Sequence, residues 1–254
     1  MQEIYYTKEI IKFMNINGIE KECTFYYVLM NDFSILKKLL EKYLVEIYAG
    51  DKKYNIKTVK QQLLHFLAKK TSNQQKGAVA EFFTHLFLID MKFQQEFIFS
   101  NLEDNSFKKG FDGLFTKDNV FWLMESKSGN TIGVTHKKKI NEAIEDITNK
   151  VEGKTPNNPF DNAVNHIRVV REDYNKTLYK TILDLSREYE CGVFHSINEF
   201  NIIPVSTIFI DHGQSIEKII IETKKLLGEK EFKDIIVICI DNSVFDSFIK
   251  SLEE

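Results

Sequence analysis

The chain has 254 residues, of which 28% are charged, and its formal net charge is −3. This length can bury a full core without disulfides, and the net charge excludes a uniformly basic surface for unspecific DNA binding. Cys23, Cys191 and Cys239 lie far apart, so a zinc site is not predicted. Neither a signal peptide nor a membrane-spanning run is recognisable, so we expect a soluble, cytoplasmic protein.

The first predicted elements are helices. Residues 33–48 repeat leucine and isoleucine at helical spacing beside a lysine-bearing face, and a second helical pattern covers about 56–69. Seven lysines and no acidic residue lie between positions 52 and 76, which is typical either of a phosphate-facing strip or of a solvated helix face. Ser72 and Gln75 fit a capping box that begins a helix reaching about Met91.

Strands are predicted in the middle of the chain. We expect a short strand at 96–100 and two more at 110–115 and 119–127, joined as a hairpin by a Lys-Asp-Asn turn. A helix at 137–151 follows. The predicted order from residue 72 is therefore a helix, three strands and a second helix.

The last part of the chain alternates helices with apolar strands. The predicted elements are a helical stretch at about 161–190, strands at 191–197 and 202–210, a helix at 216–227, the strand IIVICI at 235–240 and a closing helix at 243–252. A continuously apolar strand flanked by helices is typical of a sheet that is covered on both faces. The predicted fold class is therefore α/β.

One of the acid-x-lysine patterns stands out by its context. The pattern occurs six times, but only Glu125 follows a strongly apolar strand, VFWLM. Side chains alternate along a strand, so Glu125 and Lys127 should point to the same side as Phe121 and Leu123. An ionised pair on a buried strand face is costly unless it is compensated.

Two further acids give this pair its context. Asp112 lies on the preceding predicted strand, and the neighbouring glycines leave room for a ligand. Glu81 interrupts an apolar helix, next to small or polar helical neighbours. Taken singly, each residue also has an ordinary structural explanation. Glu125 and Lys127 can form a strand-end ion pair, Asp112 can cap a turn, and Glu81 can be a surface residue of the helix.

Three converging carboxylates favour a divalent cation. At about 5 Å and an effective dielectric of about 20, each pair repels by about 3 kcal/mol. Mg²⁺ or Mn²⁺ suits such oxygen ligands, and phosphodiester hydrolysis uses a cation of this kind with a nearby lysine. We predict that Asp112 and Glu125 are the primary ligands, that the carbonyl of Ser126 is a third, that Glu81 serves a second metal or a bound water, and that Lys127 stabilises the transition state.

The runs GAVAE, GFDG and FWLMESKSG resemble the active-site core of PD-(D/E)XK nucleases, which are restriction-endonuclease-like proteins. The resemblance assigns catalytic roles to Glu81, Asp112, Glu125 and Lys127. It implies a core with a helix, a three-stranded antiparallel meander, a helix and a further strand. The proline that names the superfamily is replaced by Phe111, a departure that is frequent among such nucleases.

Within that superfamily the chain is similar to the HamA family, the nuclease-like subunits of Hachiman anti-phage defence, most specifically over about 76–129. The resemblance implies a Mg²⁺-dependent deoxyribonuclease with little sequence preference. It also implies a superfamily 2 helicase partner, HamB, that restrains the nuclease until aberrant DNA is engaged. Residues 1–70 are then a mainly helical or α+β extension for partner or DNA contact, and 71–254 the nuclease domain.

A further set of residues is predicted to contact nucleic acid. The candidates are Lys69, Lys70, Lys76, Lys137, Lys138 and Lys139, with His136 beside the last three. His85 follows Glu81 by one turn and either lines the site or is satisfied by a neighbour. No GxxxxGK[ST] loop occurs, so ATP binding is not predicted. The alternatives are a catalytically silent adaptor that binds DNA or regulates a helicase, and hydrolysis of RNA or a small nucleotide.

Overall fold

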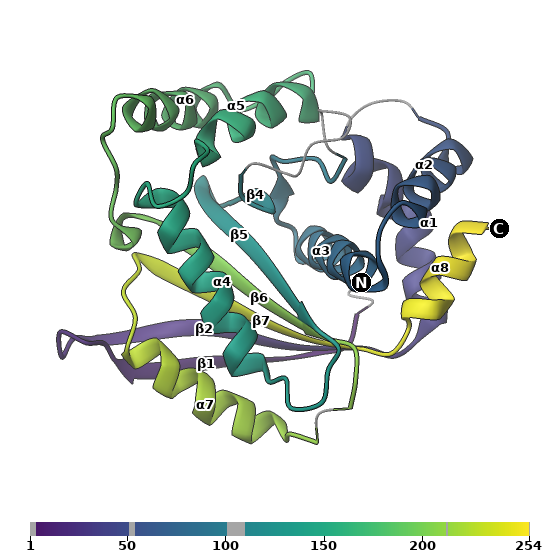
Figure 1. The fold of residues 1–254 in the computed structure, drawn as a ribbon, viewed down its shortest axis with the longest axis horizontal. Coiled ribbons are helices and arrows are strands. Elements are labelled where there is room, and N and C mark those ends of the chain that lie inside the picture. Colours follow the sequence, from purple (N-terminus) through teal and green to yellow (C-terminus); the bar gives the residue numbers. More distant parts are fainter. Residues whose placement is uncertain (1–3, 51–53, 101–109, 212, 254) are drawn as a thin grey trace.

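The computed structural model describes residues 4–50, 54–100, 110–211 and 213–253. In these ranges a seven-stranded mixed sheet is surrounded by eight α-helices (Figure 1). The strands are β1 (Tyr6–Met14), β2 (Glu20–Met30), β3 (Gln94–Gln95), β4 (Gly113–Lys117), β5 (Val120–Gly129), β6 (Asn201–Ile208) and β7 (Asp234–Asn242). The α-helices are α1 (Phe33–Ala49), α2 (Ile56–Ala68), α3 (Ser72–Asp90), α4 (His136–Val151), α5 (Pro159–Val170), α6 (Lys176–Glu190), α7 (Ile216–Gly228) and α8 (Phe245–Glu253). The predicted α/β class is confirmed.

The sheet has a parallel centre and antiparallel edges. Its strand order is β1-β2-β7-β6-β5-β4-β3, with β5, β6, β7 and β2 parallel to one another. The predicted hairpin is confirmed as β4 and β5, and β3 extends it as a third antiparallel strand. All eight residues of β6 are buried, as expected for a central parallel strand with both faces covered.

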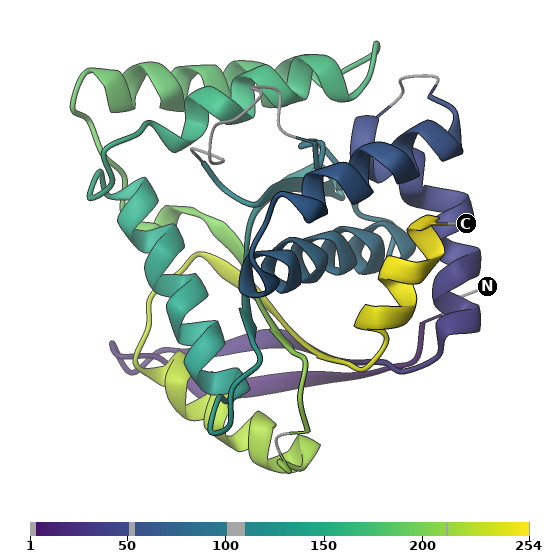
Figure 2. The ribbon, with the colours of Figure 1, turned by 45° about the vertical axis from the view of Figure 1, so that its right-hand side comes forward.

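Helices cover both faces of this sheet. Met124 of β5 belongs to the hydrophobic cluster that contains residues of α1, α2, α3 and α8, whereas Leu123 belongs to the cluster that contains residues of α4, α5, α6 and α7 on the other face. Figure 2 shows α3 and α4 on opposite sides of β5. Glu125 and Lys127 share the parity of Leu123, so α4 is the helix above them.

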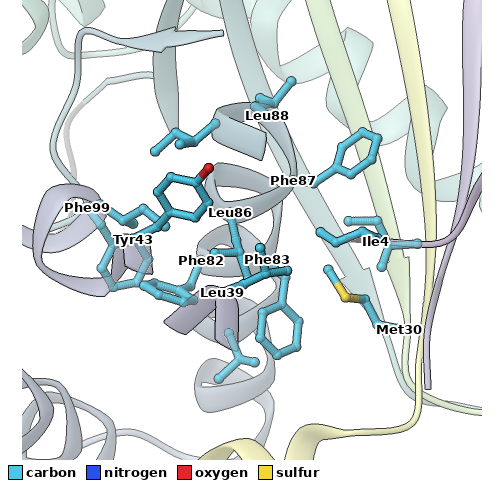
Figure 3. Close-up of a cluster of buried hydrophobic side chains, with 14 of the residues drawn as sticks. Ile4, Met30, Leu39, Tyr43, Phe82, Phe83, Leu86, Phe87, Leu88 and Phe99 are labelled. Atoms are coloured by element: carbon cyan, nitrogen blue, oxygen red, sulfur yellow. The ribbon is translucent and has the colours of Figure 1, made fainter. Parts of the chain in front are cut away.

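An aromatic core holds α3 in place (Figure 3). Phe82 and Phe83 are buried, and their ring centroids lie 5.5 and 5.1 Å from that of Phe248 on α8. Phe82 also meets Phe99 edge-on at 5.4 Å. Each such ring pair contributes about 0.5–1.5 kcal/mol beyond its buried area. Because α3 is fixed by these contacts, the positions of Glu81 and His85 on it are fixed too.

Two strands near the N-terminus were not predicted. β1 and β2 form an antiparallel hairpin, and β2 pairs in parallel with β7, from Thr24 beside Ile236 to Met30 beside Asn242. Besides α1 and α2, residues before position 70 therefore contribute two strands to the same sheet. The boundary predicted at 70/71 lies between α2 and α3.

Three predicted elements differ from the structure. Residues 96–100 form no strand, because the Phe99 N–H donates to Ile47 O of α1 at 2.9 Å instead of joining a ladder. Residues 191–197 form no strand either, since the His195 N–H donates to Val151 O at 3.2 Å. The helical stretch predicted at about 161–190 is divided into α5 and α6.

The start of α3 is shifted by one residue from the prediction. Thr71, not Ser72, is the N-cap, and its side chain accepts from the Gln74 N–H while the Gln74 side chain accepts from the Thr71 N–H. The capping box is therefore Thr71 with Gln74. Both sets of residues fit the same sequence pattern, and the geometry of the chain selects the earlier one.

Candidate active site

Two carboxylates meet where β5 passes the start of β4. Gly113 pairs with Met124, which brings the preceding Asp112 next to Glu125. Oδ2 of Asp112 accepts a hydrogen bond from the backbone N–H of Ser126 at 2.9 Å. Glu125 is only 2% exposed. Asp112 and Glu125 both line one pocket of about 360 Å³, so the structure brings these two predicted residues together.

Lys127 lies on the same side of β5 as Glu125. Its Nζ donates to Oε1 of Glu125 at 3.0 Å and also to Oδ2 of Asp146 on α4. The side chain is 28% exposed. The predicted pairing of Glu125 and Lys127 on one strand face is therefore present in the structure.

Two residues of α4 complete the ion-pair network, and neither was predicted. Lys150 Nζ donates to Oε2 of Glu125 at 2.7 Å and lies 3.7 Å from Oδ2 of Asp146. Asp146 and Lys150 are four positions apart, so they share one face of α4. They flank the buried stripe that contains Ala143 and Ile147. This flanking position is the sequence signal that could have identified them.

Burial and charge shift the ionisation of these groups. Burial, followed by the charge of Asp112, raises the pKa of Glu125 from 4.5 to about 8, against the opposing effect of Lys150 and Lys127. Burial also opposes ionisation of Asp146, but hydrogen bonding with Glu125 and the two lysine charges outweigh it and lower its pKa to about 2.

The two ammonium groups remain charged near neutral pH. Burial disfavours both cations, but the surrounding carboxylates, first of all Glu125, outweigh it and raise the pKa of Lys127 and of Lys150 above the ordinary lysine value. A lysine with a raised pKa cannot serve as a general base at neutral pH. It can stabilise negative charge that develops on a bound group.

The segment between α4 and α5 forms one wall of the pocket. Its lining consists of Gly110, Asp112, Glu125, Asp146, Lys150, Thr155, Pro156, Asn157 and Pro159. Asp112 and Glu125 therefore line the same space as the carboxylate of Asp146 and the ammonium of Lys150 on α4, and this space can admit a small polar ligand.

Glu81 lies outside this pocket. Its Oε1 is 4.0 Å from Nε2 of His85, and the same nitrogen is 3.3 Å from the carbonyl oxygen of Asp112. Nδ1 of His85 contacts Oε1 of Gln95 at 2.8 Å. Glu81 is thus connected to the Asp112 backbone through a buried histidine that is satisfied by its neighbours.

The predicted nucleic-acid lysines fall into two groups, and none of the six lines the pocket. Lys137, Lys138 and Lys139 occupy the first turn of α4, and Lys139 pairs with Glu142 at 2.6 Å. Lys69, Lys70 and Lys76 lie where α2 ends and α3 begins. The two groups belong to different layers of the fold, because α3 and α4 lie on opposite sides of the sheet (Figure 2).

The position of His136 differs from the prediction that it lies beside the three lysines and contacts phosphate. It is fully buried, and its two ring nitrogens contact Oγ of Ser206 and Oδ1 of Asp241, each at 2.9 Å. Tyr27 donates its hydroxyl hydrogen to the other oxygen of Asp241. This polar chain anchors the start of α4 to β6, β7 and β2.

Asp112 and Glu125 supply two carboxyl groups as possible metal ligands, which is not a complete coordination shell. Among the residues that the structure describes, no group of three or more His, Cys, Asp or Glu side chains is placed to hold a metal ion. Mg²⁺, however, is commonly bound through one or two carboxylates together with waters and substrate phosphate. The donor set of Asp112 and Glu125 fits this mode of binding.

None of the helices in the described ranges combines the length and the apolar character that crossing a bilayer requires.

A family model matches nearly the whole chain. A search of curated proteins finds none that matches this chain. The family model of HamA matches residues 6–254, which include both strands of the N-terminal hairpin and the complete candidate site. The chain therefore belongs to the HamA family.

Proposed function

We propose that the protein is a metal-dependent deoxyribonuclease of the PD-(D/E)XK type. The observation that carries this proposal is the convergence of Asp112 and Glu125 in one pocket, with Lys127 bonded to Glu125. The order α3, β3, β4, β5, α4 and β6 along the chain supports a restriction-endonuclease-like core, although α5 and α6 intervene before β6.

In this proposal Asp112 and Glu125 would hold Mg²⁺ or Mn²⁺, with the carbonyl of Ser126 as a third donor. A bound divalent cation activates water and neutralises charge on the phosphate. Ser126 fixes Asp112 by its N–H, and Asp146 fixes Lys127 beside Glu125. Lys127 remains protonated and stabilises the negative charge that develops on the phosphate oxygens. Glu81 would serve a second metal or a metal-bound water, as the resemblance to PD-(D/E)XK nucleases implies.

Membership of the HamA family supports a role in Hachiman anti-phage defence. We infer that the partner is a HamB-like helicase and that it restrains the nuclease until it engages aberrant DNA. The chain would then cut DNA with little sequence preference. The formal net charge of −3 agrees with this inference, because a chain without a general affinity for DNA needs a partner that brings it to DNA.

Cleavage of linear and nicked DNA in Mg²⁺, with and without the helicase, tests the proposal. Glu125→Gln should abolish cleavage, because glutamine keeps the shape of the side chain but cannot lose a proton to become the anionic ligand that the metal would need. The chain offers a matched control in Glu152→Gln, since Glu152 is also part of a Glu-x-Lys pair, bonded to Lys154 at 2.6 Å, but does not line the pocket. Unchanged cleavage by Glu125→Gln would contradict the proposal.

A catalytically silent adaptor is the second candidate. It is favoured by the engagement of both oxygens of Glu125 by lysines and by the absence of a three-ligand group among the described residues. If the protein is an adaptor, wild type and Glu125→Gln should bind DNA or the helicase with the same affinity, and neither of them should cleave DNA.

A further inference from the structure

Lys150 is placed differently from Lys127 with respect to the pocket. Both ammonium groups bond to Glu125, Lys127 to Oε1 at 3.0 Å and Lys150 to Oε2 at 2.7 Å. Only Lys150 lines the pocket, and its side chain is 14% exposed. The cation on the pocket side of Glu125 is therefore the ammonium of Lys150.

That position is one that a divalent cation would need. A metal bound between Asp112 and Glu125 would meet a positive charge already bonded to Glu125. An ammonium group and a divalent cation that share one buried carboxyl group would repel each other strongly. The ammonium and the metal therefore compete for the same carboxylate.

We propose that Lys150 is an internal cation that occupies Glu125 in the metal-free protein, and that a divalent cation binds by displacing it onto Asp146. This inference rests on the metal site of the proposed function. Asp146 is a suitable acceptor because its Oδ2 is already 3.7 Å from Lys150 Nζ, and the two residues share one face of α4. A small movement of a flexible lysine side chain completes the exchange.

The exchange makes α4 part of the control of metal binding. Lys150 and Asp146 both belong to α4, whereas Glu125 belongs to β5. The affinity for the metal therefore depends on how α4 lies over β5. A change in this packing would alter the competition without touching Asp112 or Glu125.

Mn²⁺ titration of the full chain by calorimetry, without oxygen and at a pH above the Glu125 pKa of about 8 so that this group is ionised, tests the proposal without any measurement of activity. Lys150→Met should bind Mn²⁺ about tenfold more tightly than wild type, which corresponds to about 1.4 kcal/mol. Lys150→Arg keeps the charge and should bind Mn²⁺ as wild type does. Lys139→Met is the matched control, because Lys139 is also an α4 lysine paired with a carboxylate and is similarly buried, with 18% of its side chain exposed. Its Mn²⁺ affinity should equal that of wild type.

Several outcomes would overturn the inference. Equal or weaker binding by Lys150→Met, or tighter binding by Lys150→Arg as well, would show that the lysine charge does not compete with the metal. Lys150→Gln replaces Lys150→Met if thermal unfolding shows that the methionine variant is not folded. Addition of Asp112→Asn to the neutral variant must weaken binding, since otherwise the ion binds elsewhere.

The failure of this inference can be distinguished from failure of the proposed function. Tighter Mn²⁺ binding by Lys150→Met without any DNA cleavage by wild type would support the exchange and contradict the nuclease. Cleavage by wild type together with an unchanged Mn²⁺ affinity of Lys150→Met would support the nuclease and contradict the exchange. If neither protein binds Mn²⁺, both are contradicted.

Discussion

Ser126 and Asp112 are joined by a hydrogen bond from the Ser126 backbone N–H to Oδ2 of Asp112, at 2.9 Å. The bond ties the carboxylate that precedes β4 to the strand that carries Glu125. The relative position of the two acids is therefore set by backbone geometry rather than by flexible side chains alone.

The first prediction concerns the effect of Asp112 on Glu125. Since the charge of Asp112 helps to raise the pKa of Glu125, Asp112→Asn should lower that pKa below its wild-type value of about 8. Carboxyl-detected NMR titration of the two proteins measures the shift. Asp161→Asn changes an exposed acid on α5 and is the control, for which the pKa of Glu125 should not change.

The second prediction concerns stability against pH. The pKa of Glu125 is raised by folding, so between about 4.5 and 8 the folded state holds a proton that the unfolded state has lost. The contribution of this group is complete below the unfolded pKa and is lost as pH rises through the folded pKa. One proton accounts for at most about 1.4 kcal/mol per pH unit.

Urea unfolding of wild type and Glu125→Gln at several pH values measures this effect. Glutamine imitates the protonated acid, so the variant should lose less stability than wild type as pH rises through this window. Parallel stability curves for the two proteins would show that Glu125 does not titrate in this range.

The third prediction concerns the aromatic core of the α3 face. Phe83 is fully buried and its ring lies 5.1 Å from that of Phe248. Phe83→Ala should lower the free energy of unfolding by about 3–5 kcal/mol, because it removes buried area and leaves a cavity. Ile132→Ala is the control, since Ile132 is fully exposed and should change stability by less than about 0.5 kcal/mol. A loss below 1 kcal/mol for Phe83→Ala, on this same scale, would place its ring outside the core.

The fourth prediction distinguishes the two possible starts of α3. Thr71 is the N-cap in the structure, so Thr71→Ala should cost about 1 kcal/mol of stability. Ser72 is the first helical residue, and Ser72→Ala should be close to neutral. Chemical denaturation of the two variants compares them directly, and a larger loss for Ser72→Ala would restore the capping box predicted from the sequence.

Local sequence patterns were sufficient to predict most helices and strands and part of the candidate site. Alternation along β5 correctly placed Glu125 and Lys127 on one face, and the hairpin turn brought Asp112 beside them. These features depend on residues that are close in sequence, so the pattern of the chain contains them.

Features that depend on distant packing were not predicted. β2 finds its partner in β7, at the other end of the chain, and no short pattern signals that pairing. Asp146 and Lys150 reach Glu125 only because α4 lies along β5 in one particular rotation. The apolar residues 97–99 resemble a strand, but they are buried in a connection that bonds to α1 instead.

The position of a bound cation tests the account most directly. Crystals of the protein grown or soaked in Mn²⁺ reveal the ion by its anomalous scattering. We expect one ion in the pocket, in contact with carboxylate oxygens of Asp112 and Glu125. An ion bound at another place, or an empty pocket at a Mn²⁺ concentration that supports cleavage, would contradict the account.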